Sequence, residues 1–383
     1  MRSRGVSSLI VCLAGVLVFT VCSQTRLMSA SAQQGAAPAA PMSEQVFKNI
    51  QVLKGIPADE FIDTMGMFAS ALAFDCVSCH SEEIATSATL DAFAITTPRI
   101  QMARTMIVMT NRINQMFFGG RRRVTCFTCH QSDSRPDMVP SLALQYGELV
   151  DDPYEFEFIP AFAAPTADEI FAKYVKAIGG PAALANLKTL VARGTYAGYD
   201  TGLMPVPMEM FARAPNQRSI VARGPDGVSA WTVDGASAWR MQPNTPIPVL
   251  PMTGGNLAGA RTDAMLMFPP AIKAAFDKWQ VALSEIDGRP VDVVQGTKEG
   301  QLPVTLHFDA AGLLVRVIRW NQTVVGPVPT QLDYSDYRDV SGVRMPFNLK
   351  ITWTGGEISI LLNEVQANAA VDASRFARPV PAR

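Results

Sequence analysis

Histidine and charged residues are scarce in this chain. Its 383 residues include only three histidines, and 17% of them are charged, with a formal net charge of −1. A near-neutral chain in which 48% of residues are hydrophobic is not expected to be disordered, and it lacks the basic excess of a nucleic-acid-binding protein. The length is typical of two domains, each with its own core.

Long hydrophobic runs are also absent beyond the N-terminus. An apolar run from Leu9 to Cys22 follows two arginines and is shorter than the ~20 residues of a membrane-spanning helix. With the small residues Ala30-Ser31-Ala32 behind it, the run predicts a signal peptide over residues 1–32 and export to the periplasm. Lipidation at Cys22 is the alternative, although Phe19-Thr20-Val21 lacks the small residue that such a site requires just before its cysteine.

The remaining sequence divides by composition. Residues 46–149 have helix-forming composition and helix start signals at Ile56-Pro57 and Thr97-Pro98, and they predict one all-α module. The Ala/Pro/Gln stretch before it, residues 33–45, predicts a flexible tether, and residues 150–165 predict a linker. Residues 166–383 predict a β-rich domain, so the expected fold class is multidomain α + β.

The β-rich part shows an alternating pattern. A helix is predicted to begin at Thr166 and to end at Gly179-Gly180-Pro181. Turn pairs such as Asp287-Gly288 and Ser341-Gly342 separate the predicted strands, which indicates hairpins in an antiparallel sheet. Residues 260–279 read as partly helical and are expected to lie across the sheet or close one end of it. The predicted strands are Val206 to Arg213, Arg218 to Arg223, Val304 to Phe308, Leu313 to Trp320, Asn348 to Thr354 and Glu357 to Leu362.

The four cysteines outside the predicted signal peptide fall into two copies of one motif. Cys76-Val77-Ser78-Cys79-His80 and Cys126-Phe127-Thr128-Cys129-His130 both have the CxxCH spacing of covalent haem c attachment. Residues i, i+3 and i+4 share one face of a helical turn, so two thiols can bond one porphyrin while the histidine reaches its iron. We therefore expect two covalently attached haems c. A disulfide redox pair or a zinc site is the alternative, but neither requires the adjacent histidine.

The second axial ligands follow from the shortage of histidine. Only His307 remains besides His80 and His130, and it lies in a predicted strand, so two bis-histidine haems are excluded within one chain. Methionine is abundant, with 18 residues, and His/Met ligation suits electron transfer. An open, five-coordinate iron at either site is the alternative.

Two methionine-bearing helices precede the motifs. Met65 lies on an apolar stripe with Phe61, Phe68 and Leu72, whereas Met67 points to the far side, so Met65 is the better candidate ligand. In the next helix a similar stripe leaves several candidates open. Its members are Met102, Met106, Met109, Ile113 and Met116.

The helical module resembles the cytochrome c subunit of photosynthetic reaction centres. The resemblance covers about Phe47 to Pro140 and is carried by residues 47–53, Glu60-Phe61, Thr64-Met65, Arg104-Thr105-Met106 and Arg112-Ile113-Asn114, together with the two CxxCH motifs. It implies a multihaem electron-transfer module in which Met65 and Met106 are axial ligands, with Met109 as the runner-up for the second haem. The subunit of that family resembles a chain with four haems, whereas this chain has two CxxCH motifs.

The β-rich domain looks like a lipoprotein-carrier or lipoprotein-sorting half-barrel. The resemblance is diffuse and rests on Ala167-Asp168-Glu169-Ile170, Phe211 to Asn216, Asp333-Tyr334 and Gly342 to Phe347. It implies a curved antiparallel sheet whose concave side either holds an apolar ligand or is packed by the domain's own helix.

These features predict an exported di-haem cytochrome that carries single electrons between periplasmic or membrane redox partners. The alternatives are a haem peroxidase or small-ligand sensor with one open iron, and a protein whose half-barrel binds an apolar ligand or a lipoprotein. No nucleophile triad, phosphate loop or paired carboxylates stand out, so we expect no enzymatic group transfer. Arg121-Arg122-Arg123 reads either as a solvated face or as charges that neutralise haem propionates or steer a partner.

Overall fold

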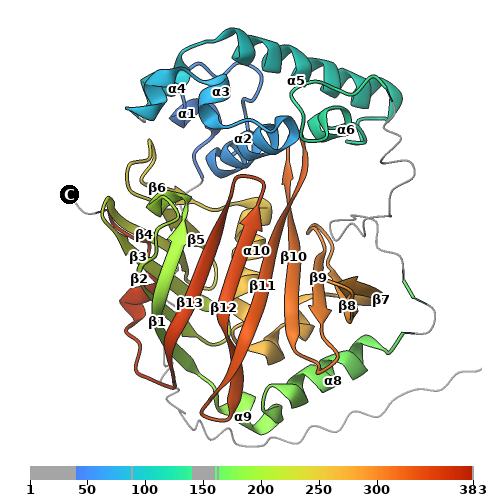
Figure 1. Cartoon of the computed structure of the whole chain (residues 1–383), viewed down its shortest axis with the longest axis vertical. Helices are drawn as coiled ribbons and strands as arrows, with labels where there is room; N and C mark the ends of the chain where they lie inside the picture. The colour runs from blue at the N-terminus through green and yellow to red at the C-terminus, as the bar shows by residue number, and fades with distance from the viewer. Residues whose placement is uncertain (1–39, 88, 140–159, 162–163, 382–383) are drawn as a thin grey trace, which may run out of the picture. The chain divides into compact units, whose positions relative to one another are not determined.

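The alternating segments form a single open antiparallel sheet. The computed structural model describes residues 40–87, 89–139, 160–161 and 164–381, and its thirteen strands follow the order β6-β5-β4-β3-β2-β1-β13-β12-β11-β10-β9-β8-β7 (Figure 1). The strands are β1 (Thr189–Gly198), β2 (Val206–Arg213), β3 (Gln217–Gly224), β4 (Gly227–Val233), β5 (Ala238–Met241), β6 (Val249–Pro251), β7 (Lys278–Ile286), β8 (Arg289–Thr297), β9 (Val304–Phe308), β10 (Leu314–Thr323), β11 (Gly326–Val340), β12 (Val343–Trp353) and β13 (Gly356–Ala367).

The antiparallel sheet confirms the hairpin prediction. Strands β2 and β9 have the predicted bounds, and the turn residues Asp287 and Gly288 have φ values of 53° and 69°, the left-handed conformation that such a tight turn needs. Strand β12 begins at Val343, five residues before the predicted Asn348, because its pairing with β11 continues to the Ser341-Gly342 turn.

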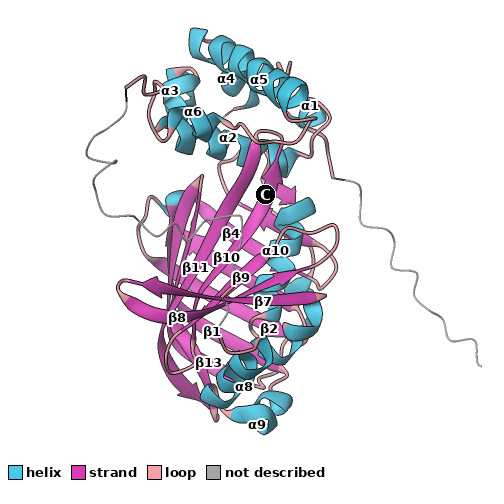
Figure 2. Ribbon diagram, turned by 90° about the vertical axis from the view of Figure 1, so that its right-hand side faces the viewer, coloured by secondary structure: helices cyan, strands magenta, loops and turns pink. Residues whose placement is uncertain are grey.

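One face of the sheet is covered by helices. They are α8 (Ala167–Ala177), α9 (Gly180–Asn186) and α10 (Gly254–Met265), with the short 3-10 turns η2 (Tyr199–Thr201), η3 (Pro269–Ala271), η4 (Lys273–Ala275) and η5 (Ala373–Phe376) elsewhere (Figure 2). The Thr166 hydroxyl caps α8 and the helix buries Ile170, Phe171 and Tyr174 against the sheet. The predicted helix start is therefore confirmed, and the domain's own helices fill much of this face.

Helix α10 shows how strongly the sheet is curved. It contacts β10 and also β3, β4 and β5, although β2, β1, β13, β12 and β11 separate these strands in the sheet. Its Asp263 accepts two hydrogen bonds of 3.1 Å from Arg319 on β10 and lies 3.6 Å from the Arg218 guanidinium on β3. One carboxylate therefore joins two distant strands across the concave side.

The helix across the sheet begins earlier than predicted. It starts at Gly254 rather than near Ala260, and Trp279 belongs to β7 instead. Two glycines in the helix explain its close approach to β10: a Cβ on Gly255 would meet Asn321 at 2.3 Å, and one on Gly259 would meet Arg319 at 2.5 Å. Glycine is a poor helix former in isolation, so the sequence does not predict a helix over these residues. The close packing of α10 against β10 nevertheless requires glycine there.

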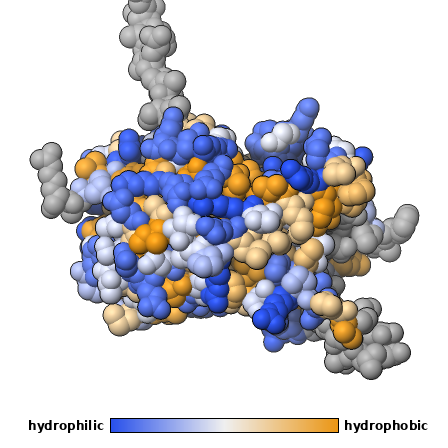
Figure 3. All heavy atoms as spheres, turned by 90° about the horizontal axis from the view of Figure 1, so that it is seen from above, coloured by the Kyte–Doolittle hydropathy of each residue, from blue (hydrophilic) through white to orange (hydrophobic). Residues whose placement is uncertain are grey.

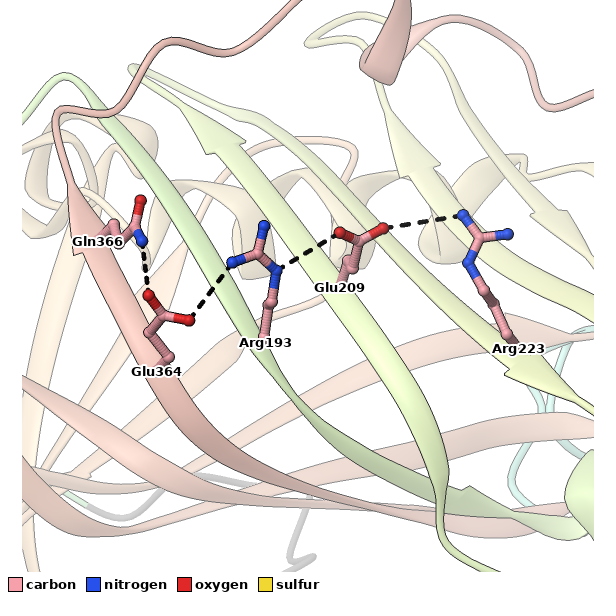
Figure 4. Close-up of polar contacts among 5 residues, drawn as sticks. All are labelled: Arg193, Glu209, Arg223, Glu364 and Gln366. Atoms are coloured by element: carbon pink, nitrogen blue, oxygen red, sulfur yellow. Dashed lines mark hydrogen bonds and ion pairs between the residues drawn. The ribbon is translucent and has the colours of Figure 1, made fainter.

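Part of the opposite, convex face of the sheet is polar. Across β13, β1, β2 and β3, the side chains of Glu364, Arg193, Glu209 and Arg223 alternate in charge, with ion-pair distances of 3.4 to 3.7 Å (Figure 4). Their side chains are between 29% and 56% exposed, so each pair contributes little to stability. The alternation confirms that one face of the sheet points to solvent.

The N-terminal part is helical. It contains α1 (Ser43–Val46), α2 (Ala58–Leu72), α3 (Cys76–Cys79), η1 (Glu82–Ala85), α4 (Leu90–Ala94), α5 (Pro98–Phe117) and α6 (Cys126–His130). Helix α1 begins inside the predicted tether, where the buried Ser43 hydroxyl donates to the Leu53 carbonyl at 2.6 Å. The predicted signal peptide and most of the predicted tether and linker lie outside the described residues. Among the described residues, no helix is long and apolar enough to cross a membrane.

Helix α2 rests on the tips of two hairpins of the sheet (Figure 1). Its Gly66 approaches Gly355 at the β12–β13 turn so closely that an added Cβ would lie 3.2 Å from the Gly355 nitrogen. Met67 packs with Val325 and Val328 around the β10–β11 turn in one buried cluster. The described residues of the helical part and of the sheet therefore belong to one compact unit.

The shared carboxylate of Asp263 predicts a large stability effect. Replacing Asp263 with Asn leaves the buried Arg218 and Arg319 charges without their counterion, which is expected to lower the free energy of unfolding by about 3 to 5 kcal/mol. Urea denaturation measures this change. The control is Glu209→Gln on the convex face, where about 1 kcal/mol or less is expected; equal effects of the two substitutions would contradict the role given to Asp263.

Candidate functional site

Both CxxCH motifs form short, capped helical turns. The Asp75 carboxylate accepts a 2.8 Å hydrogen bond from the Ser78 amide at the start of α3. Thr125 caps α6 in the same way, and the Thr128 hydroxyl accepts a 3.0 Å hydrogen bond from the Thr125 amide. The caps satisfy amides that would otherwise lack partners, which stabilises helices of only one turn.

Each motif histidine is oriented by a backbone carbonyl. The His80 Nδ1 atom lies 3.0 Å from the Phe93 carbonyl oxygen, and the His130 Nδ1 atom lies 3.0 Å from the Asp133 carbonyl oxygen. A carbonyl can only accept, so Nδ1 carries the proton in both rings and the Nε2 lone pair of the neutral imidazole is left for a metal. Burial also lowers the pKa of His80, which favours this neutral form.

The four motif cysteines are free thiols. In each motif one thiol is exposed and the other half-buried: Cys76 and Cys129 are exposed, Cys79 and Cys126 are not. Burial raises the pKa of the Cys79 and Cys126 thiols. A zinc site would require about four ligands at one point, and the described residues bring no three His, Cys, Asp or Glu side chains together in that way.

The first motif is held by the first turn of α5. The Thr97 hydroxyl donates to the Cys79 carbonyl at 2.5 Å, and the Arg99 guanidinium donates to the Ser78 carbonyl at 2.5 Å. The same guanidinium lies 5.0 Å from the centre of the Phe74 ring. These contacts fix the end of α3 that carries His80.

The second motif is held by the last turns of α5. Asn114 is 4% exposed, and its side-chain oxygen accepts hydrogen bonds of 2.9 Å from the amides of Arg123 and Val124. Its side-chain nitrogen donates to the Val124 carbonyl at 2.7 Å. In the sequence, Asn114 stands out only as one of the residues that carry the family resemblance. Its position along the chain does not predict this contact with the segment before Cys126.

The two methionines of α2 differ in burial, and the buried side of the helix is that of Met67 rather than the predicted stripe. Met65 is half-buried beside Phe61 and Phe68, while Met67 is 6% exposed and faces the hairpin turn of β10 and β11. Met67 is therefore part of the buried cluster, and Met65 is partly buried against the same cluster.

The methionine stripe of α5 does not form a protein core. Met102, Met109 and Met116 are 59%, 43% and 73% exposed, and the buried positions of α5 are Ile107 and Asn114. Met106 is half-buried next to Ile107. Viewed from the side of the helices, Figure 3 shows apolar surface between hydrophilic patches. The methionine spacing predicts that these side chains share one face of α5, but it does not predict whether other residues bury that face.

Each methionine-bearing helix packs against the other helix's motif. Among the described elements, α2 packs on α6 and α5 packs on α3, while neither packs extensively on the motif that follows it in the chain. The amide of Ser132, just after the second motif, donates to the Ala71 carbonyl in α2 at 3.0 Å. The two helix–motif units are therefore interlocked.

Arg122 and His307 were the other residues singled out in the sequence. Arg122 donates to the Thr323 carbonyl at 2.7 Å, so this arginine docks on the sheet rather than facing solvent alone. His307 is 4% exposed in β9, as expected for an ordinary strand residue, but its Nδ1 atom has no hydrogen-bond partner among the described residues.

The helical part matches a known family. Residues 18–144 match the family model described as photosynthetic reaction centre cytochrome C subunit. This part of the chain is therefore similar to a c-type cytochrome that binds haem, and the thiols, the two oriented imidazoles and the free methionines fit such a group. No curated protein matches the chain.

The β-rich part is similar to half-barrel proteins of known structure. A DUF1329 family protein from Desulfovibrio piger is 10% identical with a TM-score of 0.39, covering 55% of this chain and 96% of its own. A LolA superfamily protein from Nitrosomonas europaea is 14% identical with a TM-score of 0.36, covering 56% and 98%.

Removing the Asn114 side chain should loosen the second motif. Asn114→Ala eliminates three hydrogen bonds in a buried place, and we expect the free energy of unfolding to fall by about 2 to 4 kcal/mol. Chemical denaturation provides the measurement. Asn111→Ala, at an exposed position of the same helix, serves as the control and should change stability by about 0.5 kcal/mol or less; a similar loss in both variants would argue against the Asn114 contact.

Buried His307 predicts a loss of stability in mild acid. Burial, and then the Arg316 charge, lower its pKa to about 4, against about 6.5 in the unfolded chain. The unfolded state therefore binds the proton first, and the contribution that is present above pH ~6.5 is lost as the pH falls toward 4. His307→Gln should remove up to about 3 kcal/mol of this dependence between the two pH values; denaturation curves of identical pH dependence would exclude the effect.

Proposed function

We propose that this chain is an exported di-haem c-type cytochrome that carries single electrons between periplasmic or membrane redox partners. The proposal is based mainly on the two CxxCH turns. In each of them the histidine Nδ1 atom donates a hydrogen bond to a backbone carbonyl, which leaves the Nε2 atom to bind a metal. Such outer contacts fix the tautomer and orientation of a ligating imidazole.

The residues have distinct roles in this proposal. Cys76 and Cys79 attach one haem, and Cys126 and Cys129 attach the other, while His80 and His130 are the proximal ligands. Met65 and Met106 complete the two sites, with Met109 as the runner-up for the second. The bound haem supplies a one-electron ferric/ferrous couple, and thioether ligation raises its potential.

The helix packing supports the order of ligands along the chain. In this proposal the histidine and the methionine of one site would hold the haem between them, so the helices that carry them would not need to pack on each other. Helix α2 packs on α6 and α5 packs on α3. Met65 is thus better matched to the first motif, and Met106 to the second.

The exposed methionines of α5 provide further support. Met102 and Met109 are apolar side chains that the described residues leave 59% and 43% exposed. A porphyrin presents large apolar faces, for which thioether side chains are adaptable partners.

Replacing the second methionine ligand tests the assignment. Met106→Ala should lower the reduction potential of one haem or make it high-spin, because the iron loses its thioether. Potentiometric titration and the ferric near-infrared Met-to-iron charge-transfer band provide the readouts. Met116→Ala, on the same helix and 73% exposed, is the matched control and should leave both unchanged.

The same samples separate the alternatives. If Met106→Ala leaves both haems unaltered while Met109→Ala converts one of them, the runner-up is the ligand. Carbon monoxide binding to the reduced, native protein would contradict the closed His/Met proposal and favour a peroxidase or small-ligand sensor with an open iron.

A further inference from the structure

The concave side of the sheet retains a cavity beneath α2. Its volume is about 140 Å³, and it lies among β3, β4, β5, β12, β13, α2 and α10. Most of the concave side is filled by the side chains of α8 and of residues 266–276, so this cavity is the space left at the end nearest the helical part. A ligand in this cavity would therefore contact both the sheet and α2.

Six ionisable side chains of opposite sign line the cavity. The acidic ones already have donors: Asp59 accepts from the Thr253 amide at 2.5 Å and from the Thr253 hydroxyl at 2.7 Å, and Asp63 accepts from Asn256 at 2.6 Å. Asn321 also donates to Asp63. The full set is Asp59, Asp63, Asp263, Arg218, Arg240 and Arg319.

Two of the arginines retain unused donors. Arg218 is 7% exposed, and its Nε atom has no hydrogen-bond partner among the described residues. Arg240 is half-buried and makes no hydrogen bond or close ion pair within the part of the chain that the structure describes, although its charge interacts at longer range with Asp63. A buried guanidinium with an unsatisfied N–H is costly, and an acceptor oxygen would relieve that cost.

The remaining walls suit a flat ring. Trp231, Trp353 and Tyr196 line the cavity, and the rings of Tyr196 and Trp231 lie 5.1 Å apart at an interplanar angle of 36°. Aromatic side chains bind other rings by stacking and edge contacts. An apolar cavity of ~150 Å³ accommodates benzene, so a cavity of about 140 Å³ is the size of one six-membered ring with a small substituent.

We propose that this cavity binds a small aromatic carboxylate. The ring lies between Trp231 and Trp353, and the carboxylate accepts hydrogen bonds from the free donors of Arg218 and Arg240, since guanidinium groups match planar carboxylates. A long acyl chain is too large for this volume, because drug-sized ligands already need about 300 Å³ or more. The site is distinct from the CxxCH motifs and does not depend on haem.

Isothermal titration calorimetry with benzoate tests the proposal on the full mature chain. We expect saturable binding to one site, about tenfold tighter than the binding of benzyl alcohol, which has the same ring without the charge. Arg240→Gln should weaken benzoate binding by about tenfold or more, because it removes the half-buried guanidinium. Arg223→Gln on the convex face is the control and should bind benzoate like the unchanged chain.

A second variant addresses the cavity's volume. Ala260→Leu adds bulk from α10 to the cavity wall and removes no charged side chain, and in a folded chain it should abolish binding. Absence of saturable benzoate binding, equal affinity for benzyl alcohol, or unchanged affinity in folded Arg240→Gln would each overturn the proposal. The readout is heat of binding, so a chain that carries no haem but binds benzoate would refute the cytochrome proposal and leave this one standing.

Discussion

The ion cluster of Asp263 with Arg218 and Arg319 is the constraint on which the rest of the structure depends. It joins β3 and β10 through α10 and so holds two distant parts of one sheet at a fixed curvature. Because the charges are almost completely buried, the cluster keeps its strength only if all three members are present. The curvature places the hairpin turns that support α2, and it leaves the cavity that the arginines line.

The helical part depends on this support. Helix α2 is tied to α10 through Asp59 and to β10 through Asp63, and the turn before β11 packs under Met67. Met65 is therefore carried by a helix whose position is set by residues almost 200 positions later in the chain. In the proposed cytochrome, such rigidity would keep Met65 in place beside the haem that the first motif would hold.

Local chemistry could be predicted from the sequence, and long-range packing could not. Alternation and turn residues predicted β2 and β9 to the residue, and the CxxCH spacing predicted two one-turn helices. The methionine stripe of α5 was expected to resemble the stripe of α2, yet Met102 and Met116 are exposed. Helical periodicity predicts which side chains share a face of the helix, but not whether that face is buried. The charges of the cavity come from α2, β3, β5, α10 and β10, which only the curved sheet brings together.

In the proposed cytochrome, both motifs bind haem covalently. The most direct measurement is the intact mass of the mature protein, produced in a periplasm with a cytochrome c maturation system. The account predicts the polypeptide mass plus two haem groups, with one haem lost in Cys76→Ala/Cys79→Ala and the other lost in Cys126→Ala/Cys129→Ala. A mature chain with the bare polypeptide mass, or one whose two double variants keep the same haem content, would contradict it.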